Sequence, residues 1–293
     1  MSWDLPDMIS IREVGPRDGL QPEAPVDVAD RVRLVERLVV AGVVDIEAAA
    51  FVSPKAVPAM EGAGRVMAEI DRRPQVRYWG LVPNVRGAEL AVDAGVDAIT
   101  VTVSASERYS QANVKRSTEE SVAGMVDIVA AAEGRPVDTV ISCAFGSPYG
   151  EESIGAFDVA AMVDRVRDAG AAHVTLADTT GVATPERIAD VVTAVGADVR
   201  LHLHDTRGTA LANAFAALLL GVRAFDTAVG GLGGSPFAAG AGGNLATEDL
   251  VHLCDGLGIE TGIDLGAVVA AAGVVAGLIG RPVPSRVTAT LGG

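Results

Sequence analysis

Short runs rich in Val, Ile, Thr and aromatic residues alternate along the whole chain with longer amphipathic runs. β-branched and aromatic residues favour strands, whereas apolar residues at helical spacing favour helices. The strand-like runs cover residues 8–14, 43–49, 75–82, 98–104, 138–145, 173–179, 199–205 and 224–231. Helical patterns cover residues 27–42, 85–95, 117–134, 156–170, 185–196 and 209–221. Several of these end in Gly, the residue expected just after a helix.

This alternation predicts an α/β fold, a (β/α)₈ TIM barrel with extra C-terminal helices. Eight strand–helix units in about 260 residues match the size and rhythm of that barrel. A doubly wound open sheet is the alternative, but it would more often carry a GxGxxG turn after its first strand, where this chain reads "GPRDGLQPE". No shift in composition marks a second domain. We therefore expect one TIM-barrel catalytic domain over residues 1–293, with a helical extension from about residue 259.

Composition excludes several classes of function. The 49% hydrophobic fraction supports a sizeable core, and the net charge of −15 disfavours nucleic acid and anionic membranes as partners. The most apolar stretch, residues 267–280, is too short for a membrane span and predicts a buried helix. The N-terminus lacks the basic and apolar regions of a signal peptide, and two cysteines are too few for a disulfide scaffold. These features predict a cytoplasmic protein.

Polar residues gather where a barrel places its chemistry. They follow or end the first, second, sixth and seventh strand-like runs, as Arg17, Asp18, Glu47, Asp178, His202, His204 and Asp205. Active sites of this fold lie at the C-terminal ends of the strands. Buried charges are costly unless they are paired or bound to metal, so stability alone explains this distribution poorly.

The sequence "HLH" at residues 202–204 has three interpretations: buried structural histidines, a metal site, or an acid/base pair. Side chains two apart on a strand point the same way, so His202 and His204 share a face. Two imidazoles on one face can bind one divalent ion, with a carboxylate such as Asp18 supplying charge. The position at a strand end favours the metal interpretation. His173 and His252 lie elsewhere and are expected to be structural or solvated.

Asn244 also has two interpretations. It can cap the helix expected in "NLATEDLVHLCDG", or it can act as an oxygen ligand, since Thr247 is a rival cap. The glycine-rich loop before it can bring backbone N–H groups close to an anion, or it can be a mobile lid that needs a flexible backbone.

Taken together, six segments resemble the 3-hydroxy-3-methylglutaryl-CoA lyases, which belong to the metal-dependent TIM-barrel lyases and Claisen synthases. They read "REVGPRDGLQPE", "DIEAAAFVSPKAVPAM", "SCAFGSPY", "LADTTGVATP", "HLHDTRGTALAN" and "GGLGGSPFAAGAGGNLATEDL". The resemblance covers nearly the whole chain in the family's order. The 2-isopropylmalate and homocitrate synthases share the Arg-Asp and HxH elements but not "FVSPKAVPAM".

The resemblance implies roles by position. It makes Asp18, His202, His204 and Asn244 the ligands of a divalent metal, Mg²⁺ or Mn²⁺. It places Arg17 beside the reacting carbonyl, and Glu47 and Asp178 as acids that orient ligands or substrate. Lys115 and Arg116 would help to neutralise the phosphates of CoA. A small-molecule acyl-CoA substrate and a homo-oligomer, a dimer, are further expectations.

One departure stands out, at the position of the family's catalytic thiol. The family's loop normally reads Gly-Leu-Gly-Gly-Cys-Pro-Tyr, and this chain has Ser235 at the cysteine. A serine hydroxyl is a much weaker acid than a thiol, so Ser235 would relay a proton through water or another acid would act. Ser147, Thr180 and Arg207 also replace residues usual in the family.

The reaction implied by the resemblance is a retro-Claisen cleavage of a 3-hydroxy-3-methylglutaryl-CoA-like thioester into acetyl-CoA and a keto acid. His202, Asp18 or a metal-bound water would take the hydroxyl proton, and Arg17 would stabilise the enolate. Three alternatives stay open. They are a lyase for a related thioester such as citramalyl-CoA, a metal-dependent aldolase on a 2-oxo acid, and a catalytically impaired protein that binds metal or CoA.

Overall fold

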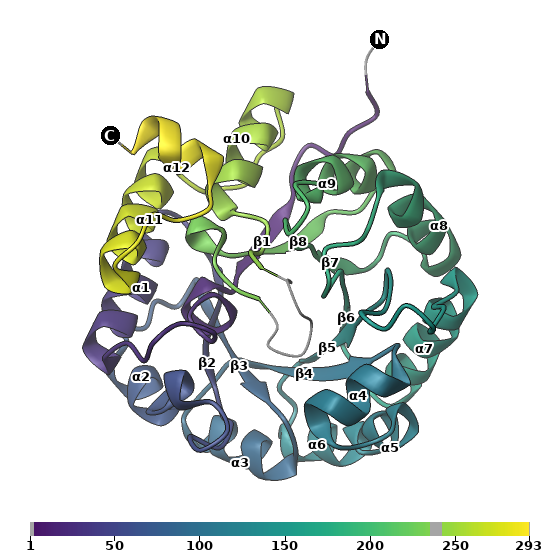
Figure 1. Cartoon of the computed structure of the whole chain (residues 1–293). Coiled ribbons are helices and arrows are strands. Elements are labelled where there is room, and N and C mark those ends of the chain that lie inside the picture. Colours follow the sequence, from purple (N-terminus) through teal and green to yellow (C-terminus); the bar gives the residue numbers. More distant parts are fainter. Residues whose placement is uncertain (1–2, 235–241, 293) are drawn as a thin grey trace.

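The computed structural model describes residues 3–234 and 242–292. Figure 1 looks down a closed barrel of parallel strands in the order β1 to β8, with β8 pairing with β1. The strands are β1 (Ser10–Glu13), β2 (Asp45–Ala50), β3 (Arg77–Val82), β4 (Ala98–Ser104), β5 (Val137–Ser142), β6 (His173–Ala177), β7 (Arg200–His202) and β8 (Ala224–Thr227). This arrangement confirms the predicted TIM barrel.

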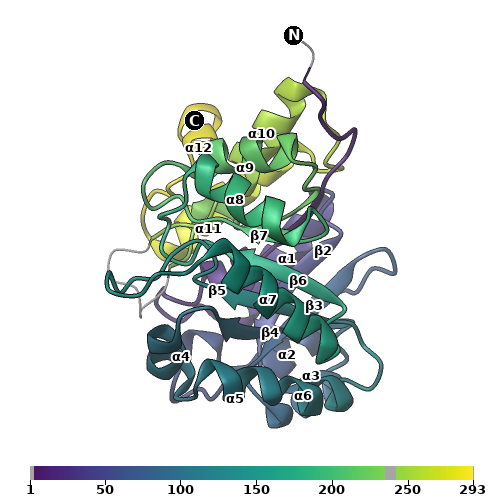
Figure 2. The same cartoon turned by 90° about the vertical axis from the view of Figure 1, so that its right-hand side faces the viewer.

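Helices form a ring around the strands, as the two views of Figures 1 and 2 show. They are α1 (Val28–Val40), α2 (Ala63–Glu69), α3 (Val85–Asp93), α4 (Glu107–Val114), α5 (Thr118–Ala123), α6 (Met125–Ala131), α7 (Ala156–Asp168), α8 (Pro185–Val195), α9 (Ala210–Leu219), α10 (Thr247–Leu257), α11 (Leu265–Ile279) and α12 (Arg286–Leu291). Short helical turns are η1 (Gly15–Gly19), η2 (Pro58–Met60) and η3 (Val229–Gly231).

Two differences from the expected helices have local causes. The helix predicted over residues 117–134 is divided at Gly124 into α5 and α6, where the hydrogen bond from Ile128 N to Gly124 O lengthens to 3.4 Å. Helices α2 and α4 were not predicted. They contain only 7 and 8 residues, too few for a clear helical period in the sequence.

The apolar stretch at residues 267–280 falls within α11, which packs against α1 and α10 and fills the ring between them (Figure 1). Val268, Ala272 and Val275 on this helix are fully buried, as the sequence predicted for a core helix. Within the described ranges, no helix combines the length and apolar character needed to cross a membrane.

Candidate metal centre and active site

The first polar residues of the site follow β1 in the turn η1. The guanidinium of Arg17 lies between two carboxylates, hydrogen-bonded through Nε to Glu47 and through Nη1 to Asp18. Glu47 belongs to β2 and is fully buried, and Arg17 is only 7% exposed. The structure therefore holds the arginine rigidly next to Asp18.

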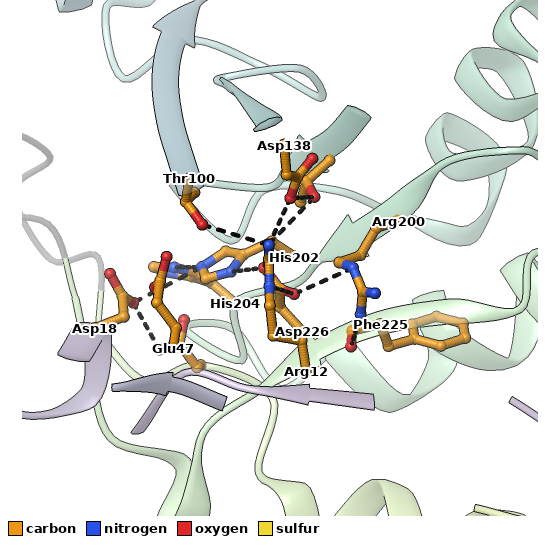
Figure 3. A network of polar contacts seen from close by, with 12 residues as sticks. Arg12, Asp18, Glu47, Thr100, Asp138, Arg200, His202, His204, Phe225 and Asp226 are labelled. Carbon is orange, nitrogen blue, oxygen red and sulfur yellow. Dashed lines mark hydrogen bonds and ion pairs between the residues drawn. The ribbon is translucent and has the colours of Figure 1, made fainter. Parts of the chain in front are cut away.

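The two histidines of the seventh strand-like run face each other. His202 ends β7, and His204 lies two residues beyond, in an isolated bridge with Asn244. Their Nε2 atoms are 3.2 Å apart, and the Nε2 atom of His202 is 3.8 Å from Asp18 Oδ2. Both imidazoles are buried, so the predicted shared face is present (Figure 3).

Asp18, His202 and His204 form a cluster that can hold a metal ion. One potential ligand atom from each residue lies within 4.8 Å of the other two. Asn244 adjoins the cluster, because its Nδ2 donates to Asp18 Oδ2 at 2.8 Å. Its Oδ1 is buried and accepts no hydrogen bond from the described residues. A buried carbonyl oxygen without a donor is the ligand type that Mg²⁺ and Mn²⁺ prefer, so the donor set fits a divalent cation.

The capping interpretation of Asn244 is wrong. Helix α10 begins at Thr247, and its N-cap is Ala246, which makes no side-chain cap. Thr247, the rival cap, instead hydrogen-bonds through Oγ1 to Thr227 Oγ1 at 2.7 Å and to Glu13. Gly233, with φ of 121°, lies against Asn244, and a Cβ there would come within 2.3 Å of Asn244 Nδ2. A glycine is therefore required for the loop to lie this close to the cluster.

Asp18 and His204 have the ionisation states that suit a cation. For His202, the burial that lowers the pKa is outweighed by Asp226 and Asp18, and the pKa is raised. Burial tends to raise the pKa of Asp18, but Arg17, His202 and Asn244 outweigh it and the pKa is lowered. Burial, together with His202, lowers the pKa of His204 to about 3. Asp18 is therefore a carboxylate and His204 a neutral imidazole at pH 7, the forms in which each side chain binds metal.

Asp178 follows β6 and is 1% exposed. Its Oδ1 accepts from Val182 N at 3.0 Å and from Ala183 N at 3.2 Å, so it fixes the loop after β6. Burial raises the pKa of this carboxyl to about 6, although those amides and Arg207 oppose the shift. Asp178 thus lies at the expected strand end. Its backbone N–H donates to the carbonyl oxygen of His202 at 2.9 Å, while its carboxylate bonds the loop amides.

No interaction joins Lys115 or Arg116 to the cluster in the described part of the chain. Lys115 and Arg116 are exposed just after α4, and Lys115 Nζ donates to Ala112 O at 2.9 Å. Ser235 lies outside the described residues. Among the remaining departures, Ser147 Oγ donates to Glu152 at 2.6 Å, and Arg207 donates to the carbonyl oxygen of Thr180 at 2.7 Å.

The sequence analysis did not predict a buried polar network that lies next to His202 (Figure 3). Arg12 of β1 pairs with Asp138 of β5 at 2.6 Å and with Asp226 of β8 at 2.8 Å. Asp226 Oδ2 in turn lies 3.2 Å from His202 Nδ1. The sequence did contain a signal for this network, because its charged residues stand inside strand-like runs. In the barrel their side chains point inward.

Comparison with known proteins agrees with this architecture. The family model described as HMGL-like matches residues 8–275. The chain is 42% identical to a 3-hydroxy-3-isohexenylglutaryl-CoA/hydroxy-methylglutaryl-CoA lyase of Pseudomonas aeruginosa, with 98% of each chain covered. It is 41% identical to an (R)-citramalyl-CoA lyase of Chloroflexus aurantiacus, covering 95% of this chain and 93% of that protein.

Solved structures give the same result. A hydroxymethylglutaryl-CoA lyase from Pseudomonas aeruginosa superposes with a TM-score of 0.94 at 41% identity, covering 98% of both chains. An HMG-CoA lyase from Acinetobacter baumannii, in complex with coenzyme A and 3-methylmalate, superposes with a TM-score of 0.92 at 38% identity. That comparison covers 97% of this chain and 95% of the other.

Proposed function

The chain belongs to the HMGL-like family, and from that membership we propose the substrate, the metal and the residue roles of its reaction. It is a carbon–carbon lyase that cleaves an acyl-CoA into acetyl-CoA and a keto acid. The substrate that we propose is 3-hydroxy-3-methylglutaryl-CoA or a close analogue. The observation that carries this proposal is the cluster of half-buried Asp18 with buried His202 and His204, with Arg17 held against it.

We propose that Asp18, His202, His204 and Asn244 hold the metal, which is Mg²⁺ or Mn²⁺. When bound there, a divalent cation polarises the hydroxyl and carbonyl oxygens of the substrate as a Lewis acid. The support is the mixed nitrogen and oxygen donor set and the Oδ1 of Asn244, which accepts no hydrogen bond from any described residue.

Cleavage removes the proton of the C3 hydroxyl and breaks the C2–C3 bond. The bonding electrons pass to the thioester enolate, C3 becomes a ketone, and protonation of the enolate carbon yields acetyl-CoA. Asp18 is the proposed base for the first proton. Ser235, outside the described residues, is the proposed relay for the last one.

Arg17 supplies positive charge for the enolate oxygen in this proposal. Glu47 and Asp18 fix its guanidinium, so little reorganisation is needed when charge develops. Asp178 would orient substrate from the loop after β6, and Lys115 and Arg116 would contact CoA phosphates from the end of α4.

Three further expectations remain predictions. They are a single catalytic domain over residues 1–293, a homodimer and a cytoplasmic location.

A second candidate substrate, citramalyl-CoA, is supported by the 41% identity to a citramalyl-CoA lyase. Both substrates would release acetyl-CoA, but the keto acid would be acetoacetate in one case and pyruvate in the other. The keto acid therefore identifies the acyl group.

The test is turnover of an acyl-CoA panel with Mg²⁺ or Mn²⁺. We expect acetyl-CoA from at least one of 3-hydroxy-3-methylglutaryl-CoA, citramalyl-CoA and a longer branched 3-hydroxyacyl-CoA, measured by liquid chromatography. Asp18→Asn should abolish turnover, whereas Asp168→Asn, an exposed carboxyl at the end of α7, should leave it unchanged. A protein that binds metal and CoA but cleaves none of these thioesters would refute the proposal, as would cleavage of a 2-oxo acid without CoA.

A further inference from the structure

A carboxylate in β8 faces the first histidine of the cluster from the inside of the barrel. Asp226 Oδ2 lies 3.2 Å from His202 Nδ1, and Asp226 is only 2% exposed (Figure 3). The opposite ring nitrogen of His202 is the one that faces Asp18 and His204. The two nitrogens of this imidazole therefore have separate partners.

Arg12 prevents the Asp226 carboxylate from rotating. Its Nε donates to Oδ1 at 2.9 Å and its Nη2 donates to Oδ2 at 2.8 Å, a bidentate pair. The two residues are register partners on the neighbouring strands β1 and β8, so the barrel itself sets this geometry. Arg200 Nε adds a third cationic nitrogen, 3.7 Å from Asp226 Oδ1.

An ionised carboxylate can only accept hydrogen bonds. The contact with Asp226 is therefore a hydrogen bond only when His202 carries its proton on Nδ1. In the neutral ring this leaves the lone pair on Nε2, which lies 3.2 Å from His204 Nε2. By contrast, His204 Nδ1 is buried and has no hydrogen-bond partner among the described residues. Among the described residues, only His202 is thus held by a hydrogen bond at the ring nitrogen that points away from the cluster.

We infer that Asp226 is a positioning residue. Arg12 immobilises its carboxylate, and the carboxylate holds His202 in the Nδ1–H tautomer. The Nε2 lone pair of His202 is then directed at Asp18 and His204. The inference deepens the proposed function, since it rests on these residues forming the metal centre. Carboxylates that accept from metal-binding histidines fix the ring orientation and raise the basicity of the ligand.

The first experiment measures the tautomer and needs no variant. The chain contains four histidines, so long-range proton–nitrogen NMR spectra of the histidine-labelled protein are simple to assign. We expect His202 to show the Nδ1–H pattern at about pH 9, where a neutral imidazole is favoured, with or without Mg²⁺. An Nε2–H pattern in the metal-free wild type would overturn the inference.

The second experiment measures Mn²⁺ affinity by isothermal titration calorimetry in Asp226→Asn and in Asp138→Asn. The two carboxylates are matched, because both are buried and both pair with Arg12, but Asp138 makes no hydrogen bond or ion pair with His202. We expect Asp226→Asn to weaken Mn²⁺ binding by about 10- to 100-fold and Asp138→Asn to change it by less than about threefold. Both should lose stability in urea, since each leaves Arg12 with one anionic partner fewer.

The outcomes separate this inference from the proposed function. Equal Mn²⁺ affinities in the two variants would overturn the role of Asp226, even if the wild type cleaves acyl-CoA. A wild type that does not cleave any thioester but shows the Nδ1–H tautomer and the affinity difference would refute the lyase and support the positioning role. Should Asp226→Asn not fold, the wild-type tautomer decides.

Discussion

At the scale of single residues, the site depends on how Arg17 is held. Its planar guanidinium spans two carboxylates that belong to different elements, Glu47 in β2 and Asp18 in η1. A lysine is a point charge without this fork and cannot reproduce both contacts at once. The role proposed for Arg17 thus depends on its shape as well as its charge.

We expect Arg17→Lys to lower kcat by on the order of a hundredfold or more, because the fixed donors stabilise charge that develops in the transition state. Metal affinity should change little, since Asp18 and the histidines remain. Steady-state release of acetyl-CoA and a Mn²⁺ titration measure the two quantities. A variant with wild-type kcat would show that Arg17 does not act in the transition state.

At the scale of elements, one buried carboxyl joins three of the segments around the site. Glu13, at the end of β1, accepts through Oε1 from Gly15 N at 2.7 Å and from Val229 N at 2.9 Å. Its Oε2 accepts from Thr247 Oγ1. These contacts connect η1, which carries Asp18, with η3 and with the start of α10.

Burial raises the pKa of Glu13 to about 7 from 4.5, although its hydrogen bonds oppose the shift. A folded state with a raised carboxyl pKa binds the proton more tightly than the unfolded state. The contribution of Glu13 to the free energy of unfolding is therefore complete below pH 4.5 and is lost as the pH rises through 7. The shift corresponds to a loss of up to about 3 kcal/mol.

Glu13→Gln, which cannot ionise, should remove this pH dependence. We expect its stability relative to wild type to rise by up to about 3 kcal/mol between pH 4.5 and pH 8. Urea denaturation at a series of pH values measures the difference. The control Glu186→Gln, exposed in the first turn of α8, should stay within about 0.5 kcal/mol of wild type throughout. A difference between Glu13→Gln and wild type that is independent of pH would contradict the prediction.

At the scale of the whole molecule, the ligand cluster joins distant parts of the chain. Asp18 follows β1, His202 ends β7, His204 lies two residues beyond β7, and Asn244 precedes α10. An ion bound by all of them would bind only the folded barrel and would stabilise it by mass action. The stability of the protein and the occupancy of the metal centre should therefore be linked.

Mn²⁺ at about 100 times its dissociation constant should add about 2.7 kcal/mol to stability and raise Tm by about 4 °C. EDTA should reverse the change. Differential scanning fluorimetry measures it, with Asp18→Asn expected to lose the shift and Asp168→Asn to keep it. An equal shift in both variants would mean that the ion binds elsewhere.

The sequence alone determined the fold, and its motifs indicated which residues the proposed ligand set contains. Strand and helix runs are local patterns, so their order along the chain was sufficient to predict the barrel. The spacing of His202 and His204 fixed their shared face, because side chains alternate along a strand. The comparisons confirmed the family that the motifs indicated.

Only the tertiary structure decided which contacts these residues make with neighbouring strands and loops. Asn244 was open to two interpretations until the structure placed the start of α10 at Thr247. Within the described ranges, Asn244 Oδ1 has no hydrogen-bond donor. The contact of Asp226 with Arg12 depends on the register of β8 against β1, which joins residues 214 positions apart. Local periodicity carries no information on such pairs. They arise only when the barrel closes and its strands take one register, which is the physical reason that the sequence did not reveal them.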